Sequence, residues 1–211
     1  MKETMRADPS PDSARWRATH ANVAREWLAG VATPWWIAGG WAVDLFVGYA
    51  SRPHEDLDVG ILRKDVMTVL RALPEWEIFE AKDGQLTFLK PGAQPRSDVH
   101  SLWCRRTGEV GWSLELMLEE SDGEYWTYRR DRRIRRHLEG VITHDSQQTP
   151  FLVPEVQLLY QAKANRPKDD ADFDLVVHRL SESGRNWLQR ALGMTIPTHK
   201  WARQLERLNA G

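Results

Sequence analysis

The stretch from residue 35 to residue 61 constrains the fold more than any other part of this chain. Its first four residues, 35–38, form a short apolar run that predicts a buried strand. The helical spacing of apolar residues over 41–47 predicts a short helix. Gly39 and Gly40 lie between them, so the predicted local order is strand, glycine turn, helix.

The end of the same stretch alternates acidic and apolar residues. Period two places the carboxylates of Asp56 and Asp58 on one strand face and the apolar residues on the other. Two carboxylates so placed can share a divalent cation, and ligation by oxygen alone suits Mg²⁺ rather than zinc. A third carboxylate on a neighbouring strand would complete the site. Glu115 is the candidate, because 112–118 shows the same alternation.

The glycine pair predicts a phosphate-binding turn. Glycines let the backbone approach an anion, and the first amides of the following helix point towards it. With a metal held by carboxylates, such a turn describes in-line displacement on a nucleoside triphosphate. Taken singly, each motif has a plainer interpretation as a tight turn or a solvated acidic face. The combined order is what favours this chemistry.

The rest of the chain predicts an α+β fold, a mixed β-sheet with flanking helices and a C-terminal helical segment. We expect a flexible N-terminal arm at 1–13, a main domain at 14–149 and a helical subdomain at 150–211. Strands are predicted at 76–79, 85–89, 99–104 and 112–118, and the Asp83-Gly84 pair predicts a hairpin turn between the first two. Helices are predicted at 14–28, 64–73, 154–164, 167–180, 184–192 and 197–208.

The amino-acid composition limits the kinds of partner that this protein is expected to bind. The 29 basic and 30 acidic residues leave a net charge of −1, which favours a small-molecule partner over nucleic acid or a membrane surface. Cys104 is the only cysteine, so an internal disulfide is excluded. No apolar run approaches the roughly 20 residues of a membrane span. We expect a cytoplasmic protein.

The motif resembles a known group of enzymes. The run Gly39-Gly40-Trp41-Ala42-Val43-Asp44, then Gly48 and Arg52-Pro53-His54-Glu55-Asp56-Leu57-Asp58, is similar to the signature of the antibiotic nucleotidyltransferases of the polymerase-beta-like superfamily. Their aminoglycoside 2''-adenylyltransferase and lincosamide nucleotidyltransferase types are the most similar. Lys163 and the run Lys168–Phe173 resemble the C-terminal helical segment of such proteins.

The resemblance implies a nucleotidyltransferase fold with two Mg²⁺ ions on Asp56, Asp58 and a third acid. It also implies a triphosphate, expected to be ATP, at the Gly39-Gly40 turn. A nucleoside monophosphate would pass to a hydroxyl of a small acceptor such as an aminoglycoside or lincosamide. Glu115 would bind metal or act as general base. The third acid of the family is often an aspartate, so Asp98 is the alternative to Glu115.

Four further residues have two interpretations each. Arg52 and His54 could contact the triphosphate or the attacking hydroxyl, or they could fix the turn that contains them. Lys163 and Lys168 could neutralise charge on pyrophosphate, or they could be solvated helix residues.

Two other functions remain open at this level. The basic run Arg129–His137 could hold nucleic acid, although a solvated or acid-paired face explains it as well. It raises the hypothesis of a toxin-like nucleotidyltransferase that modifies tRNA or protein. The unusual third acid raises the other, a catalytically inactive nucleotide-binding module of the same fold.

Overall fold

The computed structural model describes residues 16–209, so the predicted arm at 1–13 lies outside the described residues. The chain divides into two compact units, which are described separately. The first unit comprises residues 1–35 and 54–120, and the second comprises 36–53 and 121–211. The boundary predicted near residue 149, between a main domain and a helical subdomain, stays a prediction.

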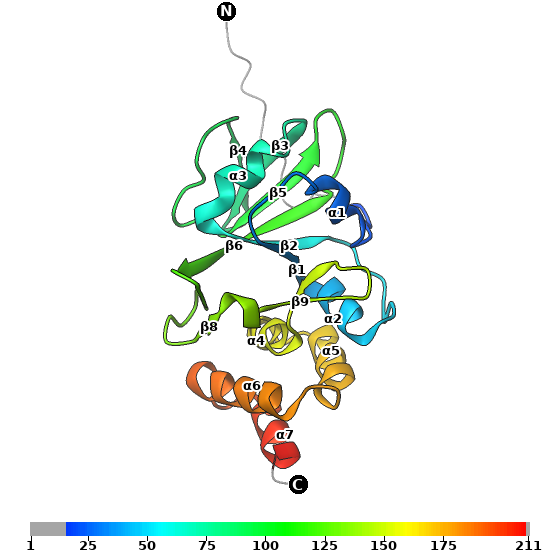
Figure 1. The fold of residues 1–211 in the computed structure, drawn as a ribbon, viewed down its shortest axis with the longest axis vertical. Helices are drawn as coiled ribbons and strands as arrows, with labels where there is room; N and C mark the ends of the chain where they lie inside the picture. The colour runs from blue at the N-terminus through cyan, green and yellow to red at the C-terminus, as the bar shows by residue number, and fades with distance from the viewer. Residues whose placement is uncertain (1–15, 210–211) are drawn as a thin grey trace, which may run out of the picture. The chain divides into compact units, whose positions relative to one another are not determined.

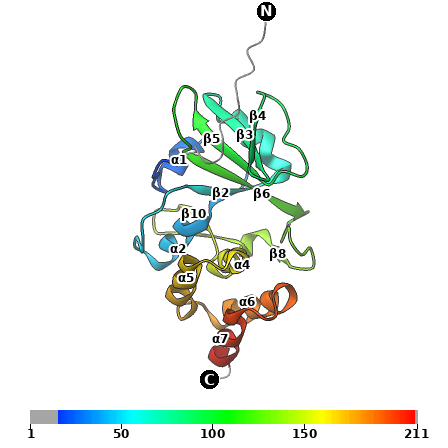
Figure 2. The ribbon, with the colours of Figure 1, turned by 180° about the vertical axis from the view of Figure 1, so that it is seen from behind.

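A mixed five-stranded sheet organises the first unit. Its strand order is β4-β3-β5-β6-β2, with β2 and β6 parallel and the other neighbours antiparallel. Figures 1 and 2 show α3 lying along one face of these strands. The elements are α1 (Val23–Trp27), β2 (Asp58–Leu62), η2 (Arg63–Asp65), α3 (Val66–Arg71), β3 (Trp76–Lys82), β4 (Gln85–Leu89), β5 (Ser101–Arg106) and β6 (Leu114–Asp122).

The turn between β3 and β4 is the predicted hairpin. Asp83 and Gly84 have φ angles of 50° and 74°. Positive φ at both central residues is typical of the tight hairpin turn that an Asp-Gly pair favours. This part of the sequence prediction is confirmed.

Aromatic side chains form a core cluster in the first unit. Phe79 and Trp112 are buried, and Trp16 and Trp103 pack against them with edge-to-face rings 5.0–5.6 Å apart. Trp16 also forms a β-bridge with Trp112. The helix expected at 14–28 is therefore wrong for residues 16–22, the part of its first half that the structure describes. Trp16 packs into this cluster instead, and α1 begins only at Val23.

The second unit combines short strands with most of the helices. Ile37 on β1 pairs in parallel with Phe151 on β10, β9 pairs antiparallel with β10, and β7 pairs antiparallel with β8. Its elements are β1 (Trp35–Ile37), α2 (Gly39–Val47), β7 (Tyr125–Thr127), β8 (Arg135–His137), η3 (Leu138–Gly140), β9 (Ile142–His144), β10 (Pro150–Leu152), α4 (Pro154–Ala164), α5 (Pro167–Val177), α6 (Glu182–Thr195) and α7 (Lys200–Asn209).

Each C-terminal helix predicted for this unit is present, although the bounds of α5, α6 and α7 differ from the predicted ones by one to three residues. The helix predicted at 154–164 has those bounds in α4, with proline in its first turn. The strands β7 to β10 were not predicted, because three residues are too few to show a period of two. Within residues 16–209, no helix is both long enough and apolar enough to cross a membrane.

Candidate active site

Two of the predicted acids are direct neighbours in the first unit. Asp58 is the first residue of β2, and its register partner on the parallel strand β6 is Glu115. Residues opposite each other on paired strands project from the same face. The next pair, Val59 and Leu116, is fully buried on the opposite face. The alternation therefore places both carboxylates together, with an apolar core behind them.

Glu115 is held in place by its surroundings. Its backbone N–H donates to the carbonyl of Leu57 at 2.9 Å, which fixes the register with the segment that leads into β2. The hydroxyl of Ser101 on β5 donates to Oε1 of Glu115 at 2.7 Å. Sequence reasoning missed Ser101, because only the pairing of β5 with β6 brings it to this carboxylate.

Asp56 lies outside the strand on which it was predicted. β2 begins at Asp58, so Asp56 belongs to the segment that precedes it. Asp56 is half-buried, and its carboxylate has no hydrogen bond or ion pair with another residue of 16–209. His54 is 7% exposed. Among the described residues, no three His, Cys, Asp or Glu side chains are close enough together to hold a metal ion as they stand.

Asp98, the alternative third acid, has a different environment. Its carboxylate accepts a hydrogen bond from Nζ of Lys82 at 2.5 Å, and its side chain is 56% exposed. The hydrogen bond from Lys82 is the main cause of a pKa below the usual value for Asp98. Asp98 is thus a surface ion-pair residue, whereas Glu115 is the strand neighbour of Asp58.

The glycine turn lies in the second unit and has the predicted form. Gly39 is the first residue of α2 and has a φ of 64°, a left-handed conformation that favours glycine. Its N–H donates to Oε1 of Gln157 on α4 at 2.9 Å. Gly40 follows in the first turn of the helix, where backbone N–H groups have no acceptor within the helix. Gln157 therefore fixes the start of α2.

Arg52 forms a two-pronged ion pair within the second unit. Its Nε and Nη2 donate to the two oxygens of Asp172 at 3.2 and 3.0 Å, and Nε2 of Gln161 donates to Asp172 at 2.7 Å. Burial opposes the charged form of Arg52. The hydrogen bond and charge of Asp172 nevertheless raise its pKa, with help from Asp44 and Asp169. Of the two interpretations of Arg52, this arrangement favours the one in which it fixes the turn.

Other acids of the motif also hold structure together. Asp44 on α2 accepts hydrogen bonds from the backbone and hydroxyl of Ser51, which shapes the link after α2. Asp169 is fully buried and accepts three hydrogen bonds, at 2.9–3.0 Å, from the backbone and guanidinium of Arg166 at the start of α5. Asp44 and Asp169 therefore have structural partners within the second unit.

The two predicted lysines lie on different helices of the second unit. Lys163 is exposed in the last turn of α4 and lines a cavity with Tyr128 and Arg130. Lys168 is exposed in the first turn of α5. Neither lysine has a hydrogen bond or ion pair with another residue of 16–209. The structure brings Lys163, but not Lys168, to a cavity wall.

Comparison with known proteins gives one family and a consistent fold. The family model described as aminoglycoside-2''-adenylyltransferase matches residues 23–173, a range that contains every predicted site residue. No curated protein is similar enough in sequence to count as a match.

Two solved structures of antibiotic adenylyltransferases have a similar fold. The lincomycin-bound lincosamide antibiotic adenylyltransferase LnuA has a TM-score of 0.53 and 16% identity, covering 77% of this chain and 97% of its own. ANT(2'')-Ia in complex with adenylyl-2''-tobramycin has a TM-score of 0.56 and 14% identity, covering 82% and 97%. At these identities the similarity shows the α+β nucleotidyltransferase fold alone.

Proposed function

The chain belongs to the aminoglycoside-2''-adenylyltransferase family, a family of nucleotidyltransferases, and from this premise we propose the reaction that it catalyses. It transfers the nucleoside monophosphate of a nucleoside triphosphate, with ATP as donor, to a hydroxyl group of a small acceptor. The acceptor is an aminoglycoside or a lincosamide antibiotic, and the reaction requires Mg²⁺.

The observation that carries this proposal is the register pairing of Asp58 with Glu115 on parallel strands. Together with Asp56 they offer only oxygen ligands, the donor set that Mg²⁺ prefers. The three carboxylates would have to reorient to converge on one ion, since they are not close enough as they stand. When bound there, Mg²⁺ would stabilise negative charge on the transferred phosphoryl group.

The proposed step is an in-line displacement at the α-phosphorus. The acceptor hydroxyl oxygen forms a bond to this phosphorus while the bond to the bridging oxygen breaks, and pyrophosphate leaves with that oxygen. The hydroxyl proton passes to a carboxylate. Glu115 would either hold the metal or accept this proton. The hydrogen bond from Ser101 fixes the orientation of its carboxylate in both roles.

Phosphate binding is assigned to the glycine turn of the second unit. Gly39 and Gly40 begin a helix of nine residues, whose amino end favours negative charge. Lys168 would add positive charge for the pyrophosphate, and His54 would assist from the link before β2. Lys163 lines a cavity that none of the proposed metal-binding carboxylates lines, so we do not assign it to the pyrophosphate. Arg52 would act as a positioning residue through its pair with Asp172 rather than as a phosphate ligand.

The acceptor class rests on the family and on the similar structures. The family description names an aminoglycoside, LnuA is described as bound to lincomycin, and ANT(2'')-Ia as bound to an adenylylated tobramycin. We extend these acceptors to the present chain as candidates for the assay, not as substrates already assigned.

Modification of tRNA is less well supported. Three of the six arginines in the basic run Arg129–His137, which suggested it, are paired with acids. Arg133 pairs with Asp131 at 2.6 Å, Arg135 with Asp122 at 3.0 Å and Arg136 with Glu155 at 2.6 Å. Cations that are paired with acids in this way are less available to bind the phosphates of a nucleic acid.

The direct test is an assay of the purified protein with Mg²⁺, each of the four nucleoside triphosphates in turn, and a panel of aminoglycosides and lincosamides. We expect pyrophosphate release that depends on one drug class, and a drug product heavier by one nucleoside monophosphate. Binding of Mg²⁺ and triphosphate without product from any combination would contradict the proposal. That result would favour the inactive nucleotide-binding module.

A further inference from the structure

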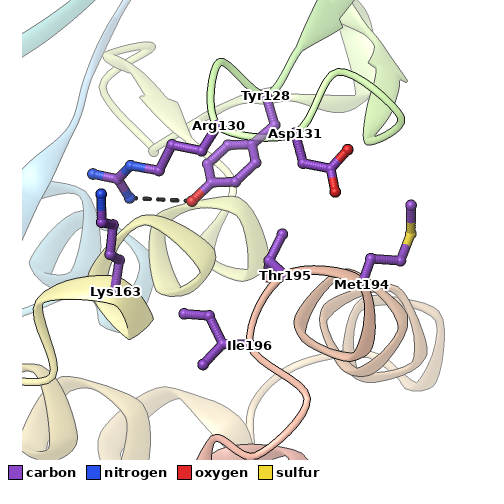
Figure 3. Close-up of a pocket in the computed structure, with 7 residues that line it drawn as sticks. All are labelled: Tyr128, Arg130, Asp131, Lys163, Met194, Thr195 and Ile196. Atoms are coloured by element: carbon purple, nitrogen blue, oxygen red, sulfur yellow. Dashed lines mark hydrogen bonds between the residues drawn. The ribbon is translucent and has the colours of Figure 1, made fainter.

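The second unit contains a cavity of about 270 Å³ that none of the proposed metal-binding carboxylates lines. We propose that it is an anion-binding site that takes a phosphate monoester with a small apolar body. Figure 3 shows the residues that form it. They come from the segment after β7, the end of α4 and the end of α6: Tyr128, Arg130, Asp131, Lys163, Met194, Thr195 and Ile196.

Arg130 contributes a cation that meets only neutral acceptors. Its Nη1 donates to the hydroxyl oxygen of Tyr128 at 3.1 Å and to the backbone carbonyl of Tyr160 at 3.2 Å. The guanidinium also lies 5.8 and 5.5 Å from the centres of these two tyrosine rings. These contacts hold the guanidinium in place but leave its charge without a carboxylate partner in the described part of the chain.

Lys163 adds a second cation on the same side. Figure 3 shows its ammonium group directed towards the guanidinium of Arg130. Lys163 has no ion pair or hydrogen bond with any other described residue. Two like charges that approach each other repel, and an oxyanion between them would offset that repulsion and accept hydrogen bonds from both.

Tyr128 supplies a third donor. The residue is 2% exposed, and its hydroxyl oxygen accepts from Arg130, so the hydroxyl hydrogen is left to donate. No residue of 16–209 accepts this hydrogen. A nearly buried phenol, a guanidinium and an ammonium group therefore present donors to one cavity, which fits the several acceptor oxygens of a phosphate.

Among the described residues, Asp131 is the only carboxylate that lines the cavity, and it is already paired with a cation. Asp131 accepts hydrogen bonds from Nε and Nη2 of Arg133 at 2.9 and 2.6 Å. The hydrogen bond from Arg133 is the main cause that lowers the pKa of Asp131 to about 2. Figure 3 shows this carboxylate on the far side of the cavity from Lys163. The cavity thus keeps a net positive charge and would repel a polycationic aminoglycoside.

Apolar side chains complete the wall opposite the donors. Ile196 is half-buried and Met194 is 41% exposed, both at the end of α6. A flexible methionine and an isoleucine suit a small apolar group better than bare inorganic phosphate. The proposed ligand therefore pairs one phosphoryl group with a small hydrocarbon or aromatic body.

Calorimetric titration of the whole protein with phenyl phosphate, without divalent cations, tests this site. We expect one binding site in the wild type, and an affinity at least about tenfold lower in Arg130→Gln and in Lys163→Met. Lys163 is exposed and has no hydrogen bond or ion pair with another residue of 16–209, so its variant should fold normally. Arg132→Gln is the matched control, because Arg132 is an exposed arginine in the same segment that does not line the cavity.

Three results would overturn the proposal. The first is a wild type that does not bind phenyl phosphate. The second is an Arg132→Gln variant that loses as much affinity as Arg130→Gln, which would indicate a general charge effect. The third is tighter binding of pyrophosphate than of phenyl phosphate, which would assign the cavity to the leaving group of the proposed reaction. None of these results depends on whether the enzyme turns over an antibiotic.

Discussion

Arg52 and Asp172 are joined by hydrogen bonds of 3.2 and 3.0 Å, although 120 residues separate them in the sequence. Asp172 is 2% exposed, and hydrogen bonds from Arg52 and Gln161 replace the water that its carboxylate would otherwise bind. The pair ties the link after α2 to α5 within the second unit. The pair formed by Arg52 and Asp172 therefore has a structural role within the second unit.

Removal of Arg52 should strongly destabilise the protein. Arg52→Ala leaves a buried carboxylate without its cation, and we expect the free energy of unfolding to fall by about 2–4 kcal/mol. Urea unfolding followed by tryptophan fluorescence measures this. Arg17→Ala is the control, because its pair with Glu109 is 50% and 33% exposed and should contribute less than about 1 kcal/mol. An equal loss of unfolding free energy in both variants would show that the Arg52–Asp172 pair has no special structural role.

Alanine at the glycine turn should also cost stability. Gly39 has a φ of 64°, and a side chain in the left-handed region costs about 1–2 kcal/mol. Gly193 within α6 is the matched control, since a Cβ there meets nothing within 4 Å and its φ is not positive. Gly193→Ala should raise stability by about 0.5–1 kcal/mol. The same denaturation experiment compares them, and a Gly39→Ala variant as stable as wild type would contradict the strained turn.

The single thiol should be inert in the folded protein. Cys104 is fully buried in β5, and burial, with a smaller effect of the Glu115 charge, raises its pKa well above the ordinary value. Since the thiolate is the reactive form, an aromatic disulfide reagent should label Cys104 only at denaturant concentrations that unfold the first unit.

An exposed cysteine provides the reference for this measurement. Val110 is 83% exposed, so Val110→Cys in a Cys104→Ala background should react at the rate of a free thiol. Labelling of native Cys104 at a similar rate would show that β5 is not buried as described.

The stability of the second unit should decrease at mildly acidic pH through His199. Burial, and secondarily Lys200, lower the pKa of His199, although Asp170 opposes this. The unfolded state, with a pKa of about 6.5, then binds more protons than the folded state. The free energy of unfolding should keep its full value above about pH 6.5 and decrease as the pH falls towards the folded-state pKa.

A neutral replacement isolates this effect. His199→Asn removes the titrating group, so the difference in unfolding free energy between wild type and variant should change across this pH range. A difference that stays constant from pH 8 to pH 5 would show that His199 titrates normally in the folded protein.

Local patterns in the sequence predicted the central elements. The run at 35–38, the glycine pair and the alternation around Asp58 and Glu115 each depend on neighbouring residues, and the structure has the two kinds of element that they predict. Their bounds differ, since β2 begins at Asp58 and leaves Asp56 outside it. Family resemblance supplied the fold that joins them. α4, with proline in its first turn, has the predicted bounds.

What the sequence could not predict depends on contacts across long separations. Gln157 reaches Gly39 across 118 residues, and Ser101 reaches Glu115 only after β5 and β6 pair. The helical spacing around Trp16 is overridden because that indole packs into the aromatic cluster. Periodicity reports which face a residue occupies, but it does not report the partner on the other side.

The central claim, that Asp58 and Glu115 carry nucleotidyl transfer, is tested most directly by the rate of pyrophosphate release in the presence of Mg²⁺, triphosphate and the accepted drug. Asp58→Asn and Glu115→Gln should each lower this rate on the order of 100-fold or more, while Asp98→Asn, a change at a surface ion pair, should stay close to wild type. A Glu115→Gln enzyme with full activity beside an inactive Asp98→Asn enzyme would contradict the account.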